Sequence, residues 1–173
     1  MKKLSIIIFF ISFGVFSQND FYKNNLGLKA YLDSIVQFES IDSIEIENEF
    51  FSKETYDGGS MLKGYFHNGK LFKIKAFFGL SYGNSSCEYY LKNEELYLVI
   101  DRFNGFKYDS ELGTFDYSKY DIAYEGKYLF EYGNLIDMIS LGHWRFEDDS
   151  NDPEKVLIEE FKEYFEIIEK SKK

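Results

Sequence analysis

Carboxylates at alternating positions are the first side chains in this 173-residue sequence whose spacing could do chemistry. Glu45, Glu47 and Glu49 alternate with Ile44, Ile46 and Phe50, which predicts a strand over 44–51 with one buried face and successive carboxylates about 7 Å apart. Glycosidases hold their two carboxyl groups about 5 Å apart when they retain configuration and about 6.5–9.5 Å apart when they invert it. The row is therefore compatible with a small hydrolase. We favour the simpler interpretation, a solvated face whose charges protect an edge strand and pair with Lys73 and Lys75.

The other residue types that support catalysis are few. The sequence has two histidines, His67 and His143, and a single cysteine, Cys87. It has no His and Cys cluster with zinc spacing and no Gly-x-Ser-x-Gly elbow, so we expect no catalytic residue, no metal and no cofactor. One cysteine cannot form an internal disulfide, which leaves a buried thiol or an intermolecular bridge, and we favour the first. The acidic run 148–152 resembles a calcium loop, but Pro153 stands where an EF-hand needs glycine.

Aromatic residues offer the better candidate for binding. One residue in five is aromatic, and the segment 103–126 is especially rich in Phe and Tyr. We interpret this segment as a long insertion without regular structure, and such loops are often functional. Tyrosine gives a large contact area at a small cost in side-chain entropy. The predicted contact residues for a protein or glycan partner are Phe106, Tyr108, Tyr117 and Tyr120. The alternative is that these rings pack the loop against the rest of the fold.

The elements that would position these residues are mostly strands. Apolar residues at helical spacing predict a first helix over 26–38, with Asn25 as its cap. A second helix begins after Asp152, which is a good cap and precedes a proline. Between the helices we expect antiparallel strands, the last of them at 143–146. The predicted fold is α+β: an antiparallel β-hairpin meander of about 7–8 strands, flanked by an N-terminal and a C-terminal helix.

Three segments repeat the same hairpin pattern, namely 64–74, 88–100 and 127–139. The first contains Asn68-Gly69, the strongest short signal for a two-residue hairpin turn. Residues 63–71 (KGYFHNGKL) and 124–135 (YEGKYLFEYGNL) resemble MORN-type repeats, and many exported bacterial proteins of unknown role have similar hairpins. The resemblance implies an elongated sheet that serves as a scaffold for binding proteins or surfaces. It implies no catalytic residue.

The start of the chain predicts export. Lys2 and Lys3 precede an apolar run from Leu4 to Phe16, and Val15 and Ser17 are small enough for signal cleavage. We therefore expect a secretory signal over 1–17 and a single domain over 18–173. The protein would act in the periplasm or be secreted, with no membrane span after cleavage.

Charge limits the classes of partner. The chain has 20 Lys and Arg against 30 Asp and Glu, a net charge of −10. This charge disfavours nucleic acid and anionic lipid surfaces, which bind proteins through Lys and Arg. The sequence as a whole predicts an exported, non-catalytic binding protein for a protein or glycan. The alternatives are a small cell-envelope hydrolase that uses carboxylates and an acidic inhibitor or immunity-like protein.

Overall fold

A computed structural model describes residues 21–147 and 150–172, so the predicted signal at 1–17 and part of the run 148–152 lie outside the described residues. The chain divides into two compact units, 1–39 and 40–173. The first contains helix α2 (Leu26–Val36), which agrees with the predicted helix except for its last two residues. Asn25 occupies the N-cap position as predicted, but its side chain makes no capping hydrogen bond, and its amide donates to the carbonyl of Phe21 at 2.9 Å. Within the described parts of the chain, no helix is long and apolar enough to cross a membrane.

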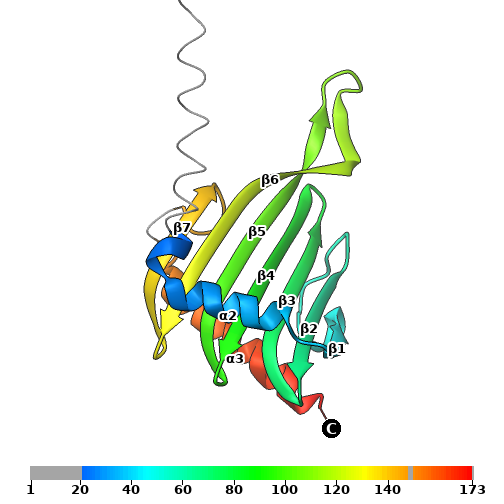
Figure 1. The fold of residues 1–173 in the computed structure, drawn as a ribbon. Coiled ribbons are helices and arrows are strands. Elements are labelled where there is room, and N and C mark those ends of the chain that lie inside the picture. The colour runs from blue at the N-terminus through cyan, green and yellow to red at the C-terminus, as the bar shows by residue number, and fades with distance from the viewer. Residues whose placement is uncertain (1–20, 148–149, 173) are drawn as a thin grey trace, which may run out of the picture. The chain divides into compact units, whose positions relative to one another are not determined.

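The second unit is built on a seven-stranded antiparallel sheet in which every strand pairs with its neighbours in sequence (Figure 1). This meander and its C-terminal helix confirm the predicted α+β class. The strands are β1 (Asp42–Glu47), β2 (Ser60–His67), β3 (Lys70–Leu80), β4 (Gly83–Lys92), β5 (Glu95–Asp109), β6 (Thr114–Glu131) and β7 (Asn134–Gly142).

The three predicted hairpins have the same local structure. Each closes with a two-residue turn in which both central residues have positive φ, as a type I′ turn requires. Each also has one extra residue at the same place on its second strand, three positions beyond the turn, where the register shifts. The turn pairs are Asn68-Gly69, Asn93-Glu94 and Tyr132-Gly133, and the extra residues are Phe72, Tyr97 and Ile136.

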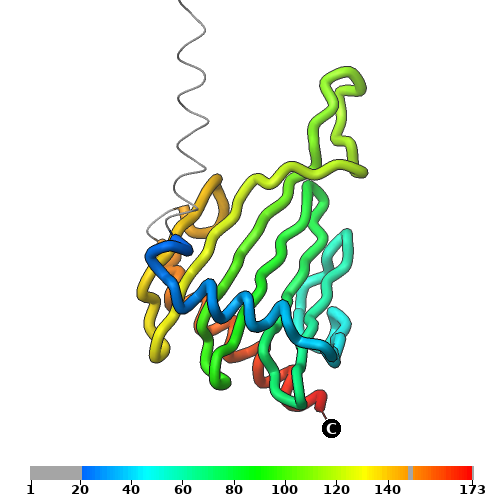
Figure 2. Tube along the Cα trace, viewed as in Figure 1, coloured from blue at the N-terminus to red at the C-terminus, as the bar shows by residue number. Residues whose placement is uncertain are grey.

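Helix α3 (Pro153–Lys170) crosses one face of the sheet (Figure 2). The Asp152 carboxylate accepts the backbone N–H of Glu154 at 3.0 Å, which confirms the predicted cap. The apolar stripe of the helix is buried as expected, through Leu157, Tyr164 and Ile168, with Phe161 and Phe165 packed at its border. Its close approach needs a glycine, since a Cβ on Gly64 of β2 would lie 2.7 Å from Ile168.

Two predicted strand boundaries were wrong. β1 ends at Glu47, and Glu49 belongs to the short 3₁₀ helix η1 (Asn48–Phe50), so the row of three carboxylates on one strand does not exist. The segment 143–146 is not a strand, because the chain leaves the sheet after Gly142, the last residue of β7, where a φ of +83° ends the extended conformation. The segment leaves the sheet and turns toward α3.

Candidate functional site

The insertion at 103–126 is not a loop, contrary to the prediction. Strands β5 and β6 remain paired as far as Asp109 and Thr114. The last pairing of β4 with β5 is at Gly105, and β7 reaches β6 only at Tyr124. Residues 106–122 therefore form a two-stranded ribbon that extends beyond the rest of the sheet (Figure 1), and we call it the projection. Alternation suited to a strand was present, but the unusual length of the segment favoured a loop.

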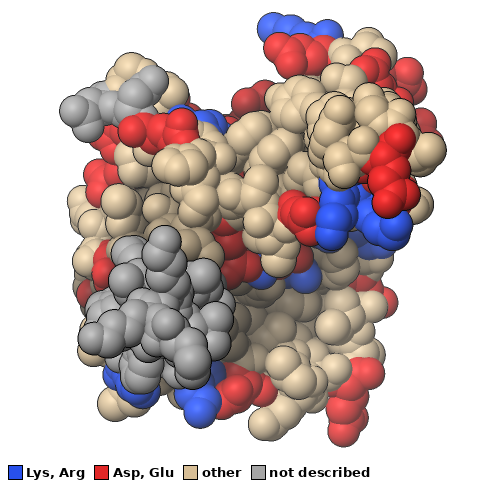
Figure 3. All heavy atoms as spheres, turned by 90° about the horizontal axis from the view of Figure 1, so that it is seen from above, with Lys and Arg blue, Asp and Glu red and all other residues tan. Residues whose placement is uncertain are grey.

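The predicted contact residues gather on this projection. Phe106 lies 5.0 Å from both Tyr117 and Tyr120, centroid to centroid, while Tyr108 contacts Phe115 at 5.7 Å. Tyr108, Tyr117 and Tyr120 are nevertheless half or more exposed, at 58, 61 and 50%. The rings pack against one another, which sets their orientation while leaving much of each accessible. Figure 3 shows the molecule from above. On the side of the projection, most of the surface belongs to uncharged residues, with charged residues around them.

A wide bulge shapes the surface of the projection. Three residues of β6, 117–119, have no partner between the pairs Phe106–Tyr120 and Lys107–Asp116. The Asp116 carboxylate holds this bulge, since it accepts the N–H and hydroxyl of Ser118 at 3.0 and 2.6 Å and contacts Lys119 at 2.6 Å. The hydrogen bonds from Lys119 and Ser118 lower the pKa of Asp116 to about 2. Tyr117 is the first residue of the bulge, and its side chain stays 61% exposed although its ring packs against Phe106.

A buried polar cluster lies between the sheet and α3. Asp101 is fully buried, and its Oδ2 accepts Arg145 Nε at 3.0 Å. Arg145 also contacts Glu160 of α3 with both terminal nitrogens, one of them at 3.1 Å, and Tyr89 donates to Glu160 at 2.6 Å. Burial raises the pKa of Asp101, and the Arg145 charge opposes that rise. Cys87 is a buried free thiol as predicted, 3.8 Å from Arg145.

Sequence reasoning missed this cluster. The only available signal was an aspartate that directly follows an apolar strand, in the run YLVID at 97–101. Its partners come from distant parts of the chain, 44 residues away for Arg145, and the predicted strand at 143–146 concealed the role of that arginine.

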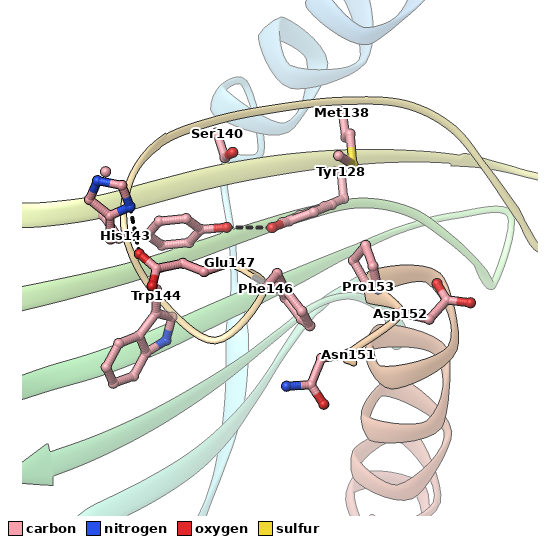
Figure 4. Close-up of a pocket in the computed structure, with 12 residues that line it drawn as sticks. Tyr128, Met138, Ser140, His143, Trp144, Phe146, Glu147, Asn151, Asp152 and Pro153 are labelled. Atoms are coloured by element: carbon pink, nitrogen blue, oxygen red, sulfur yellow. Dashed lines mark hydrogen bonds and ion pairs between the residues drawn. The ribbon is translucent and has the colours of Figure 1, made fainter. Parts of the chain in front are cut away.

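A pocket of about 540 Å³ opens beside the cluster, within the usual size range of ligand sites (Figure 4). Four aromatic side chains line it, and they come from β6 and from the segment that follows β7. Tyr124 and Tyr128 share a hydrogen bond through their hydroxyl groups, and burial raises the pKa of both. Trp144 stacks flat on Phe103 at 4.2 Å, so only part of its ring faces the pocket. The fourth ring is Phe146, 5.7 Å from Tyr128.

The remaining predicted residues do not assemble into a catalytic group. Glu45 pairs with Lys63 of β2 at 3.1 Å, and Lys73 pairs instead with Glu88 at 3.6 Å. The exposed His143 lies 2.5 Å from the carboxylate of Glu147. His67 lies 3.0 Å from the backbone carbonyl of Ser40. Among the described residues, no group of three His, Cys, Asp or Glu side chains could hold a metal ion.

Comparison of the chain with protein-family models, with curated proteins and with solved structures finds no match in any of the three. The proposals that follow therefore depend on the geometry and chemistry of this chain alone.

Proposed function

We propose that this protein is a non-catalytic binding protein and that the projection, residues 106–122, contacts a protein partner. The observation that carries the proposal is the position of the rings. They lie on a two-stranded ribbon that supplies none of the buried apolar core, and three tyrosines stay half exposed. A two-stranded ribbon is only marginally stable in water. Large apolar side chains on such a ribbon therefore add little to the stability of the fold. Contact with another molecule would explain why these rings are exposed.

Residue chemistry favours a protein over other ligands. Tyrosine and phenylalanine are enriched at the centres of protein interfaces, where their rings fill pockets on the partner. Acidic side chains outnumber basic ones on the projection, which favours a basic surface on the partner. They are Asp109, Glu111, Asp116 and Asp121, against Lys107 and Lys119.

This proposal accommodates the inhibitor-like alternative, in which the acidic surface covers a basic enzyme. The resemblance of the hairpins to MORN-type repeats agrees with a scaffold role. The predicted secretory signal at 1–17 supports a site of action outside the cytoplasm.

The test is a capture experiment with paired variants. The purified protein is immobilised and exposed to an extract of the source cells, and bound proteins are identified by mass spectrometry. A triple variant, Tyr108→Ala, Tyr117→Ala and Tyr120→Ala, should lose the specific partner. The matched control replaces Phe50 and Tyr132, which are 69 and 83% exposed but lie away from the projection, and should keep it.

Two further readouts sharpen the result. Capture should weaken as salt rises from low to moderate concentration, because exposed charges are screened beyond about 8 Å at physiological ionic strength. Hydrogen exchange of the complex should show protection of residues 106–122. A partner that both variants capture equally would reject the projection as the binding surface, and a carbohydrate array would then test the glycan alternative.

A further inference from the structure

Strand β7 is one of the two edge strands of the sheet. The other edge strand, β1, lies at the far side (Figure 1), and β7 pairs only with β6 among the described residues. The first outward position is already used, since the backbone N–H of Leu135 donates to Glu154 at 2.7 Å. The edge from there to Gly142 presents a row of backbone groups suited to pairing with another strand.

The two edges differ in how they resist such pairing. β1 has Asp42, Glu45 and Glu47 among six residues, and charges of this kind keep other strands away. β7 has one charged residue among nine, no lysine and no proline, and Ile136, Met138 and Leu141 are more than half exposed. An edge strand with these features promotes aggregation, so its presence favours a role in pairing with another strand.

The aromatic pocket lies directly beside this edge. Met138 and Ser140 belong to β7 and line the pocket, together with Gly142, so three alternate residues of the strand form one of its walls (Figure 4). A strand added to β7 would direct every second side chain to the same face. Those side chains would enter the pocket. Recognition by strand addition commonly works this way, with backbone bonds giving affinity and a pocket giving specificity.

The charge of the pocket selects the side chain. Glu147, which contacts His143, and Asp152 line it, and its described lining residues include no Lys or Arg. Aromatic rings also attract cations through their faces. A long cationic side chain would place its stem against the rings and its charge near Glu147.

We propose that β7 and the aromatic pocket form a second binding site, separate from the projection, for an extended basic segment of a protein. The segment adds as an eighth strand along β7 beyond Leu135 and places a lysine or arginine in the pocket. This site goes beyond the function proposed above and does not depend on it.

The probe is a fluorescent peptide of five Thr-Lys repeats, titrated with the purified protein and followed by anisotropy. We expect saturable binding that is at least about tenfold tighter than that of a peptide of Thr-Glu repeats. Two further peptides are N-methylated, one at every Thr and one at every Lys. Successive N–H groups of a strand point to opposite edges, so one of these peptides should lose binding and the other keep it.

Protein variants locate the site. Glu147→Gln should weaken binding of the Thr-Lys peptide by about two- to fivefold, the range for a partly exposed ion pair. Glu47→Gln removes the same charge on β1, the opposite edge of the sheet and away from the projection, and should leave the affinity unchanged. Equal affinity of the two N-methylated peptides, or equal effects of the two substitutions, would overturn the proposal. So would the absence of binding, or sedimentation of the protein alone as a dimer that the peptide does not dissociate.

Discussion

Arg145 is the residue on which the polar contacts of the interior converge. It lies between the fully buried Asp101 and Glu160, which is itself bonded to Tyr89. An ion pair of this kind adds little to stability compared with apolar packing, but removing one member leaves an uncompensated charge in the interior. The arginine therefore matters mainly because Asp101 beside it is buried.

Arg145→Ala should lower the free energy of unfolding by about 3–5 kcal/mol at pH 7. The loss should shrink as pH falls. Burial already raises the pKa of Asp101, and removal of Arg145 takes away the charge that opposes this rise. A carboxyl whose pKa is raised on folding contributes stability that is present below its unfolded pKa of about 3.9 and is lost as pH rises through its folded pKa. Urea unfolding at pH 7 and near pH 4.5 measures both effects.

Arg145→Lys is the matched control, since it keeps the positive charge beside Asp101. It should cost less than alanine, and its deficit should change less with pH. A deficit of Arg145→Ala that stayed constant across this pH range would contradict the assigned role of Asp101.

Among the elements, the three repeated hairpins give the sharpest comparison. Their turns have the same conformation, yet the second central position holds Gly69 and Gly133 in two copies and Glu94 in the third. Glu94 has a φ of +69°, a region where a side chain costs roughly 1 kcal/mol and glycine costs nothing. At its second central position, the second hairpin therefore carries backbone strain that the other two avoid.

Glu94→Gly should raise the free energy of unfolding by about 0.5–1 kcal/mol, because relief of the strain exceeds the added flexibility of the unfolded chain. Glu94→Gln is the control, because it removes the same charge but keeps the strained backbone, and it should change stability by less. Thermal or urea unfolding of the two variants measures the difference. Equal effects would mean that charge, and not φ, governs this turn.

At the scale of the whole molecule, the projection and the core are separate. The buried apolar residues of the sheet stop at Phe103 on β5 and resume at Tyr124 on β6, and none lies in 106–122. The helix α3 also packs on the other part of the sheet. The projection should thus be removable without loss of the fold.

Replacement of residues 106–120 by Asn-Gly should change the free energy of unfolding by less than about 1 kcal/mol, as expected for surface changes. The join is favourable because Gly105 and Asp121 are directly paired, so a two-residue turn can close the hairpin. Urea unfolding and the circular dichroism spectrum report the result. A loss of cooperative unfolding would show that the projection supports the sheet.

Local sequence was sufficient for the α+β class, the three hairpins and the cap of α3. Each of these depends on neighbours in the chain, such as the Asn-Gly turn at 68–69 or Asp152 before Pro153. The choice of Phe106, Tyr108, Tyr117 and Tyr120 as contact residues stays a prediction, although the chain does bring them onto one exposed ribbon.

The remaining features depend on residues that are distant in the chain. Neither the cluster of Asp101, Arg145 and Glu160 nor the pocket beside β7 has a local pattern, because their members come from the sheet, from the segment after it and from α3. The extent of β5 and β6 was likewise missed, since alternation does not tell how far two strands remain paired. Register and burial are set by contacts across the sheet, and only the folded chain makes them.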